Sequence, residues 1–192
     1  MKWTVGIDLG GTNIAVGLVD EQYEIVGREK VKTRAPRSAS SLAASMARCV
    51  NILLKRHGLR ADQLTAIGIG VPGVVDPQTK HLLYASNLFL KHVDLVSLVQ
   101  THLPDVPILV GNDADCAAYG EYLAGEAKLY DSALMLTLGT GIGGGFVCDG
   151  KIFRGGTGFG IEPGHLVVDL QEGVLCSCGQ SGCLEAYASI RG

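Results

Sequence analysis

The order of apolar and polar residues in the first third of the chain is typical of short strands followed by a helix. Three strands are predicted, at residues 3–9, 14–19 and 24–33. The residues of Gly10–Asn13 favour a tight turn between the first two strands. Residues 39–57 carry apolar side chains at helical spacing, so we expect an amphipathic helix there with Ser38 as its N-cap.

The rest of the chain continues to alternate strands and helices. Further strands are predicted at residues 65–71, 107–111, 132–138 and 143–148, with a helix at 114–125 and a hairpin turn at Asp149-Gly150 into residues 151–153. Strand, glycine turn, strand and hairpin thus occur twice, near residues 3–33 and 132–154. This weak repeat predicts two related α/β domains that meet at a cleft, which we place at residues 1–118 and 119–192.

Composition narrows the class of protein. Of the 192 residues, 47% are hydrophobic and 18% are charged, which suits one or two globular domains. The net charge of −3 argues against a protein that binds nucleic acid through electrostatic contacts with phosphates. No apolar run approaches the ~20 residues of a membrane-spanning helix. Asp8 and the glycines interrupt the first apolar stretch too early for a signal peptide. We therefore expect a cytoplasmic protein with no nucleic-acid or membrane partner and with reduced cysteines.

The first group of residues suited to chemistry is the turn that follows Asp8. Gly10 and Gly11 let the backbone approach a ligand closely, and the N–H groups of such a turn make a concave anion site. Asp8, at the end of a strand, could hold a Mg²⁺ that accompanies phosphates. An ordinary Gly-Gly hairpin is the alternative.

A second glycine turn lies at Gly139-Thr140-Gly141. The surrounding glycines match a dinucleotide fingerprint, which needs a helix next, whereas the sequence continues as a strand. Gly145 to Lys151 begins like a P-loop but has Ile152 where Ser or Thr is required. What remains is a turn placed like the first, and two such turns could clamp a polyphosphate from both sides. A purely structural turn is the alternative.

Asn112 and Asp113 lie where an apolar strand becomes a helix. Ligands bind at the carboxyl ends of strands in open α/β sheets, and a carboxylate there can act as a general base toward a hydroxyl group. Either residue would also make a good N-cap for the following helix. Both interpretations stand at this point.

Four residues near the end of the chain have the spacing of a metal site. Cys176, Cys178 and Cys183 lie within eight residues, and His165 precedes them, so a closed Cys₃His zinc site is expected. Buried thiols without a metal are the alternative. Glu162 and Glu185 flank these ligands, and such carboxylates could accept hydrogen bonds from a sugar, although each could also be a solvated surface residue. The other cysteines, Cys49, Cys116 and Cys148, are expected in the core.

Taken together, these motifs resemble the ROK family of sugar kinases and repressors, from Gly6 to Ser189. The matching segments are GIDLGGTNIAVGLVD, GVPGVVD, SNL, GNDAD, LGTGIGGG, E-x-G-H and C-x-C-G-x-x-G-C-x-E. The resemblance implies an actin-like, ribonuclease H-like ATPase fold, with two α/β domains around a cleft. It implies ATP with Mg²⁺ at Asp8, Gly10, Gly11, Thr12, Asn13, Gly139, Thr140 and Gly141. It implies sugar contacts from Gly73, Asn87, Asn112, Asp113, Glu162, His165 and Glu185, with Asp113 as the catalytic base. The implied structural zinc has His165, Cys176, Cys178 and Cys183 as ligands.

The sequence departs from the family pattern in several places. Leu-Phe-Leu-Lys-His follows Asn87 where relatives often have a Pro-Gly-Trp turn, Asp115 replaces a frequent Asn, and Ile161 replaces a frequent Gly. Family members also usually continue for another hundred or so residues, which carry the adenosine contacts. We therefore expect the second domain to be incomplete in this chain.

The resemblance implies phosphorylation of a hexose at its 6-hydroxyl by ATP, with glucose as the first candidate and a homodimer as the expected assembly. N-acetylglucosamine, N-acetylmannosamine, fructose and allose are alternative substrates. A sugar-sensing regulator without chemistry is a different class of function, although the first phosphate motif begins within ten residues of Met1 and leaves no room for a DNA-binding domain before it. A zinc-binding interaction module is a further alternative, but it would need none of the glycine turns.

Overall fold

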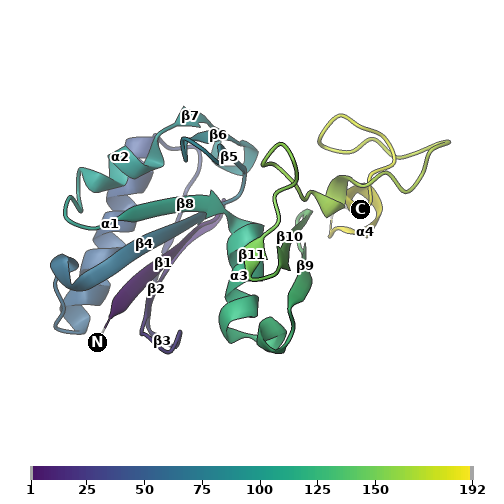
Figure 1. Ribbon diagram of the computed structural model, residues 1–192. Helices are drawn as coiled ribbons and strands as arrows, with labels where there is room; N and C mark the ends of the chain where they lie inside the picture. The colour runs from purple at the N-terminus through teal and green to yellow at the C-terminus, as the bar shows by residue number, and fades with distance from the viewer. Residues whose placement is uncertain (1, 191–192) are drawn as a thin grey trace. The chain divides into compact units, whose positions relative to one another are not determined.

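A computed structural model describes residues 2–190 (Figure 1). Its internal contacts divide the chain into two units, Met1–Asp113 and Ala114–Gly192. The division falls at the start of helix α3 (Asp113–Ala124), and the predicted domain boundary at residues 118/119 lies further along the same helix.

The first unit is built on a five-stranded sheet in the order β3-β2-β1-β4-β8. Its strands are β1 (Trp3–Leu9), β2 (Asn13–Val19), β3 (Ile25–Lys32), β4 (Leu64–Val71) and β8 (Ile108–Asn112). The first three form an antiparallel meander, whereas β4 runs parallel to β1 and β8 runs parallel to β4. The carboxyl ends of β1, β4 and β8 therefore share one edge of the sheet.

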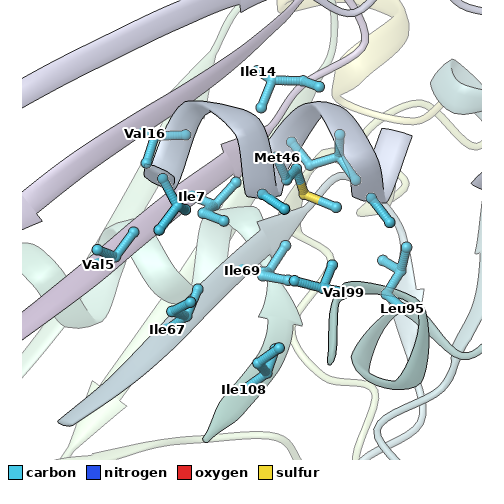
Figure 2. Packing of buried hydrophobic residues seen from close by; sticks show 14 of the residues in the cluster. Val5, Ile7, Ile14, Val16, Met46, Ile67, Ile69, Leu95, Val99 and Ile108 are labelled. Atoms are coloured by element: carbon cyan, nitrogen blue, oxygen red, sulfur yellow. The ribbon is translucent and has the colours of Figure 1, made fainter. Parts of the chain in front are cut away.

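One face of this sheet is covered by the helices α1 (Ala39–Arg56) and α2 (Leu95–Gln100). Figure 2 shows Met46 of α1 and Val99 of α2 among strand residues such as Ile7 and Ile69, all of them buried. Along β1 the buried residues alternate with the exposed Gly6 and Asp8, as the pleat of a strand requires. The predicted cap is confirmed, because the Ser38 hydroxyl accepts a hydrogen bond of 3.3 Å from the Ser41 amide.

Several short elements between β4 and β8 were not predicted. They are β5 (Val74–Val75), β6 (Leu82–Ala85) and β7 (Leu90–Val93), which form a small antiparallel sheet, together with α2 and the 3₁₀ helix Ser86–Leu88. Strands of two to four residues are too short to show a period in the sequence. Another 3₁₀ helix, Ala61–Gln63, precedes β4.

The second unit contains a three-stranded antiparallel sheet in the order β11-β10-β9. Its strands are β9 (Ser132–Leu138), β10 (Ile142–Cys148) and β11 (Lys151–Ile152). The 3₁₀ helix Glu126–Leu129 leads into β9, and the 3₁₀ helix Pro163–His165 and α4 (Glu185–Ala188) flank a long loop. Isolated bridges join Val167 to Cys183 and Leu175 to Ser181 within that loop.

The cysteines outside the expected metal site do not all lie in the core. Cys49 is buried and Cys148 is half-buried, but Cys116 is exposed, so its predicted burial was wrong. The buried side of α3 carries Ala114, Asp115 and Ala118, and Cys116 lies off that stripe. None of the helices among residues 2–190 combines the length and the hydropathy that crossing a membrane requires.

Candidate functional site

The first glycine turn forms where the sequence predicted it, between β1 and β2. The Gly10 amide donates a hydrogen bond of 3.0 Å to the Asn13 carbonyl, which closes the turn. Asp8 lies on the exposed face of β1 just before the turn. A carboxylate and a tight backbone turn are thus presented together at one end of the strand.

Asn87, in the 3₁₀ helix Ser86–Leu88, lies directly against this turn. A Cβ added at Gly11 would lie 3.2 Å from the Asn87 Cβ, so a side chain at residue 11 would push the two segments apart by a few tenths of an ångström. Asn112 ends β8, and its side-chain Nδ2 donates a hydrogen bond of 3.1 Å to the Gly73 carbonyl. The turns after β1 and β4, the end of β8 and the Asn87 segment therefore meet at the carboxyl edge of the sheet.

Asp113 follows Asn112 as the first residue of α3. Although Asp8 is exposed as a residue, partial shielding of its carboxylate from water raises its pKa; the negative charge of Asp113 raises the pKa further, while Lys30 acts in the opposite direction. The two carboxylates are thus close enough to repel each other. Such a pair suits a divalent cation, because hard cations prefer carboxylate oxygens and would relieve the repulsion.

In the second unit, the turn Gly139–Gly141 joins β9 to β10 as an antiparallel pair. The prediction of a returning strand rather than a helix is confirmed. Glu185 lies against this turn, and its Oε2 accepts a hydrogen bond of 2.8 Å from the Ile142 amide. A Cβ added at Gly141 would overlap that same oxygen.

The four expected metal ligands converge in the second unit. The ligand atoms of His165, Cys176, Cys178 and Cys183 all lie within 4.8 Å of one another. Cys176 Sγ is 3.7 Å from His165 Nδ1, and Cys178 Sγ is 3.7 Å from Cys183 Sγ. A tetrahedral zinc with Zn–S bonds of ~2.3 Å holds its sulfurs ~3.8 Å apart, so the donor atoms fit this ion.

The thiols of this cluster have different pKa values. Burial raises the pKa of Cys183 to about 12, and its contacts with the neighbouring thiols add to the shift. A hydrogen bond from the Gln180 backbone instead lowers the pKa of Cys178. Binding of a divalent metal to this set would release protons, since thiolates are the ligands.

The segment that carries Glu162 and His165 is held within the second unit. The His165 amide donates a hydrogen bond of 3.0 Å to the Glu162 carbonyl. Upstream of it, Arg154 pairs with the buried Asp115 of α3 at 3.3 Å. The Arg154 carbonyl accepts a hydrogen bond of 3.0 Å from the Gly160 amide, which closes the loop before Glu162.

Two residues near the candidate site were missed in the sequence. The Ser177 hydroxyl donates a hydrogen bond of 3.1 Å to Oε1 of Glu185, so the C-x-C motif also holds this carboxylate. The place of Ser177 between two of the expected cysteine ligands could have indicated, in the sequence, that it lies near the metal site. Arg154 pairs with a residue far away in the sequence, and no local pattern indicates that contact.

The similarity of the chain to known proteins identifies its family. The model of the ROK family matches residues 4–192. The chain belongs to the ROK family. A glucokinase of Streptomyces coelicolor is 37% identical over 191 residues, which are 100% of this chain and 57% of the relative. The ROK chain thus spans little more than half the length of that curated relative.

Solved structures place the ROK chain in the actin-like fold that was expected. A ROK glucokinase from Streptomyces griseus, solved with glucose and AMPPNP, superposes with a TM-score of 0.83 at 38% identity, over 97% of this chain and 57% of the other. The family also contains regulators. A xylose repressor of Caldicellulosiruptor bescii is 34% identical over 97% of this chain and 46% of its own length.

Proposed function

We propose that the gene product is an ATP-dependent hexose kinase that phosphorylates the 6-hydroxyl of its substrate, with glucose as the first candidate. The observation that carries the proposal is the pairing of Asp8 and Asp113 at the carboxyl edge of the first sheet, next to a glycine turn that Asn87 contacts. The glucokinase of Streptomyces coelicolor supports the choice of sugar.

In this proposal Asp113 is the general base. It accepts the proton of the hexose hydroxyl as that oxygen attacks the γ-phosphorus of ATP, and ADP leaves with the bridging oxygen of the bond that breaks. Asn87 and Asn112 orient the sugar ring from the first unit. Gly73 contributes by holding Asn112, since its carbonyl accepts a hydrogen bond of 3.1 Å from the Asn112 side chain.

The phosphate groups of ATP are assigned to the two glycine turns. Backbone amides of Gly11, Thr12 and Asn13 in one turn, and of Thr140 and Gly141 in the other, would donate hydrogen bonds to phosphate oxygens. Gly10 and Gly139 would shape these turns, because their amides donate to the carbonyls of Asn13 and Gly141 at 3.0 Å. Asp8 would hold the Mg²⁺ of the nucleotide, which supplies charge neutralisation during phosphoryl transfer.

Glu162, His165 and Glu185 are the proposed sugar contacts of the second unit. His165 would use Nδ1, the atom 3.7 Å from Cys176 Sγ, toward a structural zinc, which leaves the other ring nitrogen for a sugar hydroxyl. Both carboxylate oxygens of Glu185 already accept hydrogen bonds, from Ile142 and Ser177. A carboxylate oxygen has more than one lone pair, so Glu185 retains acceptor capacity for a sugar.

A sugar-sensing regulator is the second candidate, because the similarity to the xylose repressor is nearly as high as that to the glucokinase. A sensor needs the sugar contacts but no general base. The two functions therefore differ in whether bound hexose is phosphorylated.

The test is ADP release by the complete gene product with Mg-ATP and a panel of hexoses. We expect turnover with at least one hexose, and Asp113→Asn should lower kcat by about 10²-fold or more while hexose affinity is retained. Asp105→Asn, the same change at an exposed position, is the control and should keep full activity. Calorimetric hexose binding without any ADP release would contradict the kinase and favour the regulator.

A further inference from the structure

Thr33, which follows β3, makes two hydrogen bonds to the first glycine turn. Its hydroxyl donates to the Gly10 carbonyl at 2.6 Å, and its amide donates to the Thr12 carbonyl at 3.0 Å. The residue is fully buried, with a relative exposure of 0%. One residue thus holds the backbone on both sides of Gly11.

Arg37 holds Thr33 in turn. Its guanidinium donates to the Thr33 carbonyl at 3.1 Å, and it also donates to the Ser41 carbonyl at 2.8 Å and to the Ser45 hydroxyl at 2.8 Å. Ser41 and Ser45 belong to α1, whose buried face packs in the core of the first unit. The turn is therefore connected to the core through Thr33, Arg37 and the first turns of α1.

We infer that Thr33 and Arg37 are positioning residues that hold the backbone of the Gly10–Thr12 turn in the shape that receives a phosphate group. The inference rests on the proposed function, because it assigns that turn to the nucleotide. Neither side chain needs to touch the ligand. A turn built from two glycines has many accessible conformations, and backbone donors recognise an anion only when they point at it together.

The two hydrogen bonds of Thr33 distinguish a residue that positions the turn from one that only stabilises the core. A buried threonine that only stabilised the core could donate its hydroxyl hydrogen bond to any nearby acceptor. Here both donors of Thr33 are directed to carbonyls of the same turn, on either side of the residue that Asn87 contacts. Loss of the hydroxyl should therefore change the nucleotide kinetics more than the hexose kinetics.

The first test is Thr33→Val in the complete gene product, which keeps the shape of the side chain and removes the donor. We expect KM for ATP to rise about tenfold, the effect of one lost hydrogen bond, while KM for the hexose changes less than about twofold. Thr33→Ser should restore most of the affinity for ATP. Arg37→Lys keeps the charge but not the planar fork, and should raise KM for ATP by a smaller factor.

Thr101→Val is the matched control. The Thr101 hydroxyl also donates to a backbone carbonyl, that of Leu98 at 2.7 Å, but at an exposed position after α2. This variant should leave both KM values unchanged. Equal changes of the two KM values in Thr33→Val, or failure of Thr33→Ser to restore the nucleotide kinetics, would overturn the inference.

A second measurement does not depend on kinase activity. Amide hydrogen exchange, followed on peptides that cover residues 9–15, should become faster in Thr33→Val and stay unchanged in Thr101→Val. If the wild-type protein has no kinase activity but this exchange result is obtained, the proposed function fails and the positioning role stands. Unchanged exchange in Thr33→Val would contradict the positioning role itself.

Discussion

Replacing Gly141 by alanine should separate Glu185 from the second glycine turn and destabilise the second unit. A methyl group at this position overlaps Oε2 of Glu185, the atom that accepts the hydrogen bond from the Ile142 amide. The same carboxylate is held on its other oxygen by the Ser177 hydroxyl. Glu185 thus connects the turn to the cysteine-rich loop, and one methyl group added at residue 141 disturbs that connection.

The size of the effect follows from what the carboxylate loses when it moves. Oε2 is the far end of a flexible side chain, so the overlap alone is relieved at little cost. The displaced carboxylate gives up a part-buried hydrogen bond of 2.8 Å, and a hydrogen bond to a charged group contributes about 1.5–3 kcal/mol. We therefore expect a loss of about 2 kcal/mol, or a fall in Tm of about 4–8 °C for a chain of this size.

Urea and thermal unfolding of the wild-type protein and two variants would measure this loss. Gly139→Ala is the matched control, because it adds the same methyl group to the same turn and meets no heavy atom within 4 Å. We expect the control to stay within about 0.5 kcal/mol of the wild type.

A double-mutant cycle identifies the cause of the loss. If Gly141→Ala acts through Glu185, it should cost less than about 0.5 kcal/mol in a Glu185→Ala background. An undiminished loss in that background would refute the reasoning, and so would an equal loss in Gly139→Ala.

Two further predictions concern the metal site and Asp8. Elemental analysis of protein purified without added metal should find one zinc per chain, and the Cys183→Ser variant should lose it. Absence of zinc from protein with intact thiols would contradict the proposed zinc site. The folded state raises the pKa of Asp8, so the ionised carboxylate lowers stability once the pH exceeds its unfolded pKa of ~3.9. Asp8→Asn should therefore raise Tm at pH 7 but not below pH ~3.9, as pH-dependent calorimetry would show, and equal Tm values at pH 7 would contradict the shift.

The main strands and helices could be predicted because each has a clear period or a clear boundary. The strand Trp3–Leu9 alternates buried and exposed residues, and the helix Ala39–Arg56 begins directly after its predicted cap. The small sheet of β5, β6 and β7 was missed because its strands are too short for a period to appear. The exposed Cys116 shows a different failure, since apolar character alone does not say which side of a helix is buried.

The candidate site was predictable only where its residues are close in the sequence. The spacing of the cysteines predicted the cluster that the structure brings together with His165. In contrast, the contacts of Thr33 with Gly10, and of Glu185 with Ile142, join segments that are far apart in the sequence. These contacts depend on how the strands and the loop run in space, and a single sequence taken by itself does not reveal that.

The carboxylates of Asp8 and Asp113 bear on the choice between a kinase and a sugar sensor. Desolvation raises the pKa of Asp8, the charge of Asp113 raises it further, and Lys30 offsets this only in part, so the ionised Asp8 carboxylate costs stability at neutral pH. A protein that only binds a sugar could place a neutral side chain at residue 8 and gain stability. A protein that brings Mg-ATP to a hydroxyl group needs one carboxylate for the cation and another for the proton. The presence of both carboxylates therefore supports the proposed kinase.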